Sequence, residues 1–280
     1  MCEALVGQGH KVISLDNYLT GGKENHIAGA EYIEGDTALI SSLIKIVPDL
    51  VFHLGEYARV EKSFEDLELV WQSNVAGTFQ VLEFCRKRKI KIVYAGSSTK
   101  FGLPAAQGTA QAGDGGFGRD QSPYAWTKST NTELVRNYGA WFGLPYAITY
   151  FYNVYGPRER SDAFGTLIAI FKKKYLKDET LPVVSPGTQR RNFTYVSDVV
   201  SGLLKVGEKG EGDEYGLGSE ESYSVLEVAQ MFGGKIEMLP ERKGNRMNGK
   251  LDTNRAKQEL NWRATRRLED YIAEIKKQKK

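Results

Sequence analysis

Apolar runs rich in β-branched residues alternate with longer stretches of helical periodicity along the first half of the chain. Strands buried on both faces of a parallel sheet show such near-continuous apolar runs, so we expect strands at 11–16, 50–55, 90–96 and 146–153. Helical spacing is clearest in two segments that end in a basic cluster or a glycine, as helix ends prefer: 74–88 and 127–143. This alternation predicts an α/β fold built on a doubly wound parallel sheet.

The pattern changes after about residue 155, where the apolar runs shorten and the loops lengthen. We therefore predict two domains, a Rossmann-like domain over 1–155 and a smaller α/β substrate lobe over 156–280. Residues 192–208 are expected to return a strand and a helix to the first domain. Residues 103–118 are rich in Gly, Ala and Gln and predict a loop directly after the third strand.

The N-terminal segment predicts the end of a helix, a turn and a strand that closes on Asp16. In a dinucleotide-binding fold these elements follow a first strand and a glycine-rich turn, and we expect that strand and turn to be absent here. An acidic residue after the second strand binds the adenosine ribose hydroxyls and repels a 2′-phosphate, so Asp16 favours NAD over NADP. The alternative is that Asp16 only caps a loop.

Composition disfavours several classes of protein. The net charge is only +3, and basic residues are dispersed apart from a short run at 276–280, which argues against nucleic acid as a partner. No apolar run approaches the roughly 18 residues of a membrane span and the N-terminus lacks a signal-peptide pattern, so we expect no membrane contact and a cytoplasmic location. The 2 Cys and 3 His show no metal-like spacing, so neither a disulfide framework nor a metal site is expected.

A series of short motifs runs through nearly the whole chain: "LDN" (15–17), "GD" (35–36), "VFHLG" (51–55), "NVAGT" (74–78), "YAGSS" (94–98), "SPYAWTK" (122–128), "FYNVYGP" (151–157), "RRNFTYVSDV" (190–199) and "LNW" (260–262). Their order and spacing resemble the extended short-chain dehydrogenase/reductase family, within it the nucleotide-sugar epimerases typified by UDP-glucose 4-epimerase. The resemblance implies a homodimer that binds NAD and a nucleotide sugar, with a UDP-sugar expected as the substrate. It also implies 4-epimerisation by transient oxidation at C4 and return of the hydride.

The resemblance assigns an adenosine end of the NAD site. Asp16 and Asn17 are similar to the ribose contacts, and Asp36 is similar to the partner of the adenine amino group. Asn74 resembles a residue that steadies the cofactor pocket. Asp36 has an ordinary alternative role, since an aspartate there also suits a helix cap.

Leu54 and Gly55 resemble the backbone that lines the NAD pyrophosphate, and Leu54 is expected in the core in either case. The residue that follows them departs from the family, because Glu56 stands where small residues or serine are more usual. Gly96, next to the expected end of the third strand, is a similar departure.

Ser97, Tyr124 and Lys128 are the expected catalytic residues, and Tyr124 and Lys128 are also expected to contact NAD. With 15 Tyr in the chain, roughly one Tyr-x-x-x-Lys arises by chance, so this spacing alone carries little weight. A free tyrosine is a poor base at neutral pH unless positive charge stabilises its phenolate, which Lys128 and the nicotinamide ring would provide. In the implied mechanism Tyr124 takes the proton of the sugar C4 hydroxyl, and Ser97 hydrogen-bonds that hydroxyl.

Four residues are expected to bind the substrate. Asn153, Arg191 and Arg242 resemble contacts of the substrate diphosphate, for which forked guanidinium donors are suited. Asn245 stands where the family usually has an acidic residue that touches the nucleotide ribose. The segment 181–184, "LPVV", is expected as an edge against the base.

The residues after Ser97 favour epimerisation over dehydration. Dehydratases that resemble this fold carry an acidic residue there, whereas this chain has Ser98, Thr99 and Lys100, which favours epimerisation. Gly249 would leave space for a 2-N-acetyl group, so the expected substrates include the N-acetyl forms of the UDP-sugars. Two alternatives remain: another NAD-dependent nucleotide-sugar epimerase or reductase, and a non-catalytic sugar-nucleotide-binding remnant that lacks normal NAD binding.

Overall fold

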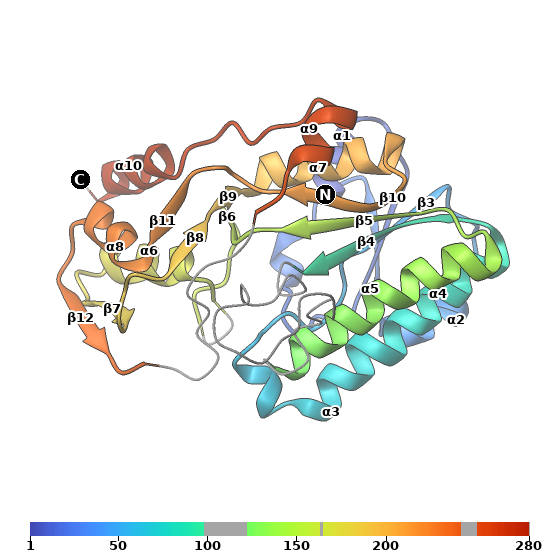
Figure 1. The fold of residues 1–280 in the computed structure, drawn as a ribbon, viewed down its shortest axis with the longest axis horizontal. Coiled ribbons are helices and arrows are strands. Elements are labelled where there is room, and N and C mark those ends of the chain that lie inside the picture. The colour runs from blue at the N-terminus through green and yellow to red at the C-terminus, as the bar shows by residue number, and fades with distance from the viewer. Residues whose placement is uncertain (98–121, 163–164, 242–250, 280) are drawn as a thin grey trace, which may run out of the picture. The chain divides into compact units, whose positions relative to one another are not determined.

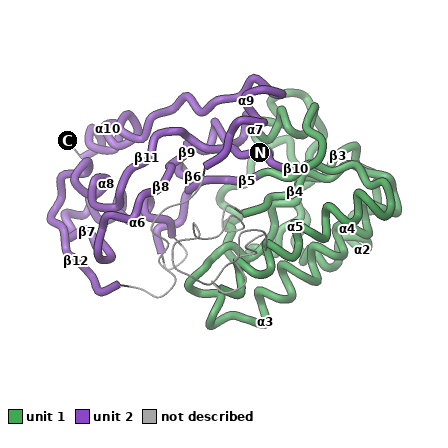
Figure 2. The backbone as a smooth tube through the Cα atoms, viewed as in Figure 1, with its two compact units in different colours: residues 1–100, 117–149, 203–213 green, residues 101–116, 150–202, 214–280 purple. Residues whose placement is uncertain are grey.

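Figure 1 shows the computed structural model of the chain, which describes residues 1–97, 122–162, 165–241 and 251–279. The chain divides into two compact units (Figure 2). Unit 1 comprises 1–100, 117–149 and 203–213, and unit 2 comprises 101–116, 150–202 and 214–280.

The strands of unit 1 are parallel where their pairing is defined. They are β1 (Val12–Asp16), β2 (Ala30–Glu34), β3 (Leu50–His53), β4 (Lys91–Ser97), β5 (Tyr146–Phe151) and β10 (Gly212–Leu217). The last two strands begin in unit 1 and end in unit 2. β1 pairs in parallel with β2, and β3 pairs in parallel with β4 in a four-stranded sheet of order β10-β5-β4-β3. Among the described residues no strand joins the β1–β2 pair to β3, which is the edge of the larger sheet.

The helices of unit 1 are α1 (Cys2–Gly7), α2 (Ile40–Leu43), α3 (Leu67–Val70), α4 (Gly77–Arg88), α5 (Pro123–Phe142) and the second half of α7 (Val196–Lys209). Short 3₁₀ turns occur at η1 (Lys23–Asn25), η2 (Thr37–Leu39) and η3 (Lys62–Phe64), and a π-helical segment, η4 (Trp71–Ala76), leads into α4. The long helices α4 and α5 lie side by side (Figure 1).

Helices cover both faces of the four-stranded sheet. Neighbouring residues of a strand point to opposite faces. The His53 ring hydrogen-bonds Thr78 on α4 at 2.8 Å, whereas Phe52 packs against Gly207 on α7, where an added Cβ would lie 2.7 Å from the Phe52 ring. α4 and α7 therefore lie on opposite faces, and the sheet is doubly wound, as the sequence predicted.

Unit 2 has short strands and a hydrophobic core of its own. Its strands are β6 (Val154–Tyr155), β7 (Leu181–Val184), β8 (Arg190–Asn192), β9 (Thr194–Tyr195), β11 (Ser222–Ser224) and β12 (Ile236–Leu239), and its helices are α6 (Leu167–Leu176), α8 (Val225–Phe232), α9 (Asn254–Leu260) and α10 (Leu268–Gln278). β6 and β9 are parallel, as are β7 and β12, whereas β8 and β11 are antiparallel. The core gathers fully buried side chains of α6, α8, α10 and β7, among them Phe171, Phe232, Ile275 and Leu181.

The four expected strands are confirmed as β1, β3, β4 and β5, although β3 already ends at His53. The expected helices are present too, but the first of them begins as a π-helical segment and the second begins at Pro123. The sequence analysis missed β2, because "AEYIE" has few apolar residues and a glutamate at its end. Within the described ranges, no helix combines the length and apolarity that a membrane crossing needs.

Candidate active site

α5 carries Tyr124 and Lys128 near its N-terminus. The helix begins after Ser122, whose Oγ accepts a hydrogen bond from Ala125 N at 3.1 Å, and Pro123 occupies the first turn, where proline is tolerated. This start puts Tyr124 in the first turn, half-buried, and Lys128 one turn later with only 5% exposure. Residues four apart share a face of a helix, so the two side chains are neighbours on α5.

Lys128 is directed into the interior of unit 1. Its Nζ donates to the Ala95 carbonyl oxygen at 2.6 Å, forms an ion pair with Glu56 and lies 5.1 Å from the centre of the Tyr94 ring. Ala95 belongs to β4, and Ser97 is the last residue of that strand and is buried. The ammonium group therefore ties the first turns of α5 to the strand end that carries Ser97.

Glu56 is a site residue to which the sequence analysis gave no role. Its side chain is 2% exposed, and its carboxylate oxygens accept hydrogen bonds from the Tyr94 hydroxyl at 3.1 Å, from Asn131 Nδ2 at 2.8 Å and from the Thr78 hydroxyl. Together with Lys128 these donors satisfy a buried carboxylate. The signal in the sequence was the departure at this position, but the donors lie 22 to 75 residues away along the chain.

Burial and charge act against each other in this cluster. Burial works to raise the pKa of Glu56, but the charge of Lys128 and the hydrogen bonds outweigh it, so this pKa lies below its ordinary value. Burial lowers the pKa of His53 to about 4, with Glu56 opposing and Lys128 assisting. Burial, with the charge of Glu56, holds the pKa of Tyr94 well above its usual range. At neutral pH Glu56 is therefore ionised, whereas His53 and Tyr94 are neutral.

Asn74 holds the segment that contains Glu56. It is fully buried; its Oδ1 accepts from Tyr57 N at 2.7 Å, and its Nδ2 donates to Tyr57 O at 3.1 Å and to Thr127 Oγ1 at 2.9 Å. Its own carbonyl oxygen accepts from Asn131 Nδ2 at 2.8 Å. This arrangement suits the steadying role expected of Asn74, while a direct contact with a cofactor stays a prediction.

Leu54 and Gly55 are both exposed directly after β3. The expectation that Leu54 packs in the core is wrong, because the strand ends at His53 and Leu54 is 40% exposed. Exposed backbone at the carboxyl end of a parallel strand is nevertheless where such folds bind ligands.

Asp16, Asn17 and Asp36 lie together at the carboxyl ends of β1 and β2. Asn17 Nδ2 donates to Asp36 Oδ2 at 3.4 Å. Asp36 also accepts from Ala38 N at 2.8 Å as the cap of η2, and Asp16 accepts from Tyr18 N at 2.8 Å. The capping roles considered as alternatives are thus present, and the side chains of Asp16 and Asn17 remain exposed beside them.

In unit 2, Asn153 lies beside the strand that contains Arg191. Asn153 Nδ2 donates to the carbonyl oxygen of Asn192 at 3.1 Å, and Thr194 N donates to the Asn153 carbonyl at 3.3 Å. Asn153 has a φ of 39°, in the left-handed region that asparagine adopts more readily than most residues. Arg191 directly precedes Asn192 in β8. Of the other predicted positions, Arg242, Asn245, Gly249, Lys100 and 103–118 lie outside the described residues.

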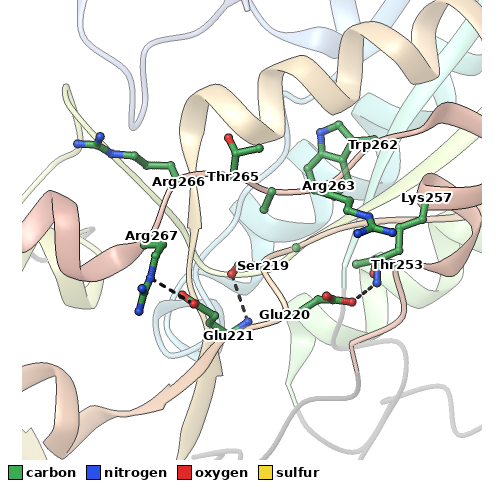
Figure 3. A pocket seen from close by; sticks show the side chains of 12 residues that line it. Ser219, Glu220, Glu221, Thr253, Lys257, Trp262, Arg263, Thr265, Arg266 and Arg267 are labelled. Carbon is green, nitrogen blue, oxygen red and sulfur yellow. Dashed lines mark hydrogen bonds and ion pairs between the residues drawn. The ribbon is translucent and has the colours of Figure 1, made fainter.

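A separate pocket of unit 2 lies between the segments 218–221 and 262–267 (Figure 3). Its volume is about 250 Å³. Two cations of its lining, Lys257 and Arg267, form ion pairs with the two glutamates of the first segment. None of the expected site residues that the structure describes lines this pocket, so we do not assign the substrate to it.

Comparisons with known proteins agree with this fold. The model of a family described as the NAD dependent epimerase/dehydratase family matches residues 1–218. A UDP-N-acetyl-alpha-D-glucosaminuronate decarboxylase of Bacillus cytotoxicus is 32% identical, over 82% of this chain and 74% of its own length. A UDP-glucose 4-epimerase of Mycolicibacterium smegmatis is 27% identical, over 98% of this chain and 92% of its own. The solved structure of a Thermus thermophilus UDP-glucose 4-epimerase in complex with NAD is 25% identical with a TM-score of 0.85, covering 97% of this chain and 91% of that one.

Proposed function

Because the chain belongs to the NAD dependent epimerase/dehydratase family, we propose that it catalyses NAD-dependent 4-epimerisation of a nucleotide sugar, either UDP-glucose and UDP-galactose or their N-acetyl forms. One observation carries the proposal: Tyr124 and Lys128 share a face of α5, and Lys128 is bonded to the strand that ends in Ser97. A tyrosine whose phenolate a neighbouring cation can stabilise, with a serine beside it, is a set of groups suited to proton transfer at a sugar hydroxyl.

Each of these residues has a defined task in the proposed reaction. Tyr124 takes the proton of the C4 hydroxyl and later returns a proton to the same oxygen. Ser97 hydrogen-bonds that hydroxyl and orients it, and Lys128 supplies positive charge one helical turn from the phenol. A bound NAD would supply the acceptor for the C4 hydride and the source of its return to the other face of the sugar, so the cofactor would be regenerated.

The residues present fit the adenosine end of NAD. Asp16 offers an exposed carboxylate at the end of β1, where such folds bind the ribose hydroxyls, and Asn17 and Asp36 lie beside it. Leu54 and Gly55 leave exposed backbone after β3 for the pyrophosphate, and Asn74 steadies that segment through Tyr57. We assign no glycine-rich turn to the cofactor, since no such turn occurs among the described residues of unit 1.

We assign the nucleotide sugar to unit 2 and the cofactor to unit 1. Asn153 and Arg191 are linked through Asn192 and would bind the diphosphate. A guanidinium group suits this task because it donates two parallel hydrogen bonds to an anion. Arg242 and Asn245, outside the described residues, would complete the contacts with the diphosphate and the nucleotide ribose.

A second candidate is decarboxylation of a UDP-uronate, which the relative of 32% identity performs by its name. Oxidation at C4 of a uronate gives a β-keto acid, which loses CO₂ readily, so both reactions would begin with the same proton transfer at Tyr124. Only the substrate carboxylate separates them.

The experiment is a substrate panel with NAD present: UDP-glucose, UDP-galactose, their N-acetyl forms and UDP-glucuronate. Anion-exchange chromatography separates the C4 epimers, and CO₂ release is measured in parallel. We expect C4 epimers of the neutral sugars and no CO₂. Consumption of UDP-glucuronate alone, with CO₂ release, would select the second candidate instead.

We further propose that the protein works as a homodimer in the cytoplasm. Exposed large apolar side chains occur on the adjacent helices α4 and α5 and on η4, namely Phe79, Trp141, Phe142 and Trp71. A second copy of this surface would cover them, since a dimer with twofold symmetry presents the same patch from both partners. Sedimentation of wild type and Trp141→Glu tests the dimer, because a glutamate buried in the dimer interface should release monomers.

The proposed cytoplasmic location is supported by the two cysteines, which are both free and so suit a reducing compartment.

A further inference from the structure

Lys128 is bonded from two sides, by the Ala95 carbonyl and by the Glu56 carboxylate. The side chains of Lys128 and Glu56 are almost excluded from solvent, so water screens their charges weakly. An unpaired lysine would present its full positive charge to a neighbouring phenol. This lysine instead belongs to a pair without net charge.

Ionisable groups face Glu56 from each element packed around it. His53 lies on β3, Tyr94 on β4 and Lys128 on α5, while α4 contributes the hydroxyl of Thr78. The Thr78 hydroxyl donates its single hydrogen to Glu56, so the Thr78 oxygen accepts a hydrogen bond from His53 Nε2 at 2.8 Å. Burial lowers the pKa of His53 to about 4 and leaves its ring neutral, so Lys128 is the cation that balances Glu56.

The influence of Glu56 extends to the first turn of α5. Lys128, the ion-pair partner of Glu56, lies one helical turn from Tyr124 on the same face of α5. The hydroxyl of Tyr94 bonds both oxygens of Glu56 at 3.1 Å. Glu56 therefore acts directly on the cation that neighbours Tyr124 on the helix.

We propose that Glu56 is a positioning residue of the reaction, which holds the Lys128 ammonium group at the end of β4 and offsets the positive charge that Lys128 presents to Tyr124. The proposal rests on the proposed function, in which Tyr124 is the base. A neutral residue in place of Glu56 would leave Lys128 more effective in stabilising a phenolate. With Glu56 present, turnover therefore reaches its maximum at a higher pH than it would with a neutral residue at this position.

The test is the pH profile of kcat for Glu56→Gln, which keeps the size of the side chain and removes its charge. The acid limb of this profile, where kcat rises with pH, should move to lower pH by on the order of one pH unit, because Lys128 then acts on Tyr124 without an opposing charge. Glu56→Asp keeps the charge and should hold the limb near its wild-type position. Should Glu56→Gln not fold, Glu56→Ala replaces it, with the same shift expected.

Glu83→Gln is the matched control. Glu83 also bonds a cation and a tyrosine, Arg86 at 2.7 Å and Tyr138 at 3.0 Å. Tyr138 lies far along α5 from Tyr124, about 20 Å by the rise of the helix, so this substitution should leave the acid limb in place.

A second measurement does not depend on turnover. The ultraviolet absorbance of tyrosinate is titrated in wild type and in Glu56→Gln, and the signal of Tyr124 is obtained by subtracting the Tyr124→Phe form of each. Its midpoint should move to lower pH in Glu56→Gln, even if the protein epimerises no sugar of the panel. A Glu56→Gln protein folded by circular dichroism, in which both the midpoint and the acid limb match wild type, overturns the proposal.

Discussion

The carboxylate of Glu56 and the ammonium group of Lys128 form an ion pair inside unit 1, where their side chains are 2% and 6% exposed. Removing two charges from water costs several kcal/mol, which can cancel the attraction between them. The pair is stabilising only where further hydrogen bonds satisfy the buried charges. Here Tyr94, Asn131 and Thr78 donate to the carboxylate. The pair therefore ties the segment after β3 to α5 next to the proposed base.

Replacing Lys128 with methionine leaves the Glu56 carboxylate buried without a cation. We expect the free energy of unfolding to fall by about 3–5 kcal/mol, the usual cost of breaking a buried pair from one side. The double variant Lys128→Met with Glu56→Gln should recover part of this loss, since no charge is then left uncompensated. Urea unfolding followed by circular dichroism measures all three proteins.

The control for this loss is Lys87→Met. Lys87 pairs with Glu83 at 3.6 Å, but its side chain is 62% exposed. An exposed pair of this kind contributes little, so the change should stay within about 0.5 kcal/mol. A loss for Lys128→Met no larger than that of the control would contradict a buried ion pair.

Acid should destabilise the protein through His53 before the carboxylates titrate. The pKa of His53 is about 4 in the folded protein, against an ordinary value of 6.5. Between these values the unfolded chain binds a proton that the folded protein does not, so stability is complete above about pH 6.5 and falls toward pH 4. The loss from His53 over this window should be on the order of 3 kcal/mol, and His53→Gln should remove it.

The comparison is sharpest between about pH 6.5 and 5.5, because most carboxylates titrate at lower pH. The free energy of unfolding is measured at both pH values in wild type and in His53→Gln. His26→Gln, at an exposed position, is the control. Equal pH dependence in wild type and His53→Gln would show that the imidazole is not held neutral.

Asn74→Ala should loosen the segment that carries Glu56. The substitution removes the Asn74 donors of the Tyr57 carbonyl and the Thr127 hydroxyl, and it leaves the Tyr57 N–H with the Ser73 hydroxyl alone at 3.0 Å; a buried polar group left unsatisfied costs about 1–3 kcal/mol. We expect a loss of about 2–4 kcal/mol in stability and faster hydrogen exchange of the Tyr57 amide. Asn17→Ala, at an exposed position, should leave that amide protected, and equal exchange in the two variants would count against the role of Asn74.

Asp16→Ser tests the adenosine end of the proposed cofactor site. The carboxylate at the end of β1 should repel the 2′-phosphate of NADP, so its removal should bring the Kd for NADP closer to that for NAD by about tenfold. Fluorescence titration with both dinucleotides measures the ratio. Glu34→Gln at the end of β2 removes a nearby charge already paired with Lys23 at 2.6 Å, and its ratio should stay at the wild-type value. A ratio that moves equally in both variants would contradict a specific contact with Asp16.

Local patterns in the sequence predicted much of the fold. The strands β1, β3, β4 and β5 are near-continuous apolar runs, and Ser122 with Pro123 starts α5 so that Tyr124 and Lys128 fall on one face. β2 was missed because only two adjacent apolar residues, Tyr32 and Ile33, mark its middle. Its pairing with β1, rather than its own pattern, makes it a strand.

The environment of Lys128 could not be predicted in the same way. Glu56 was recognisable as unusual at its position, but its partners Thr78, Asn131 and Lys128 come from two helices that only the fold brings to it. Leu54 failed for a related reason, since its apolar side chain follows the end of β3 and lies outside the core. Long-range packing decides both cases, and no local pattern records it.

The most direct test compares wild type with Tyr124→Phe. Each protein is denatured to assay released NAD, and native samples are incubated with UDP-galactose and UDP-N-acetylgalactosamine while their C4 epimers are measured. We predict bound NAD and epimer formation in wild type, and a fall in turnover of about 100- to 10,000-fold in Tyr124→Phe with UDP-sugar binding retained. Equal turnover by the two proteins, or neither NAD nor epimers from wild type, would contradict the assignment of Tyr124 as the base of a nucleotide-sugar epimerase.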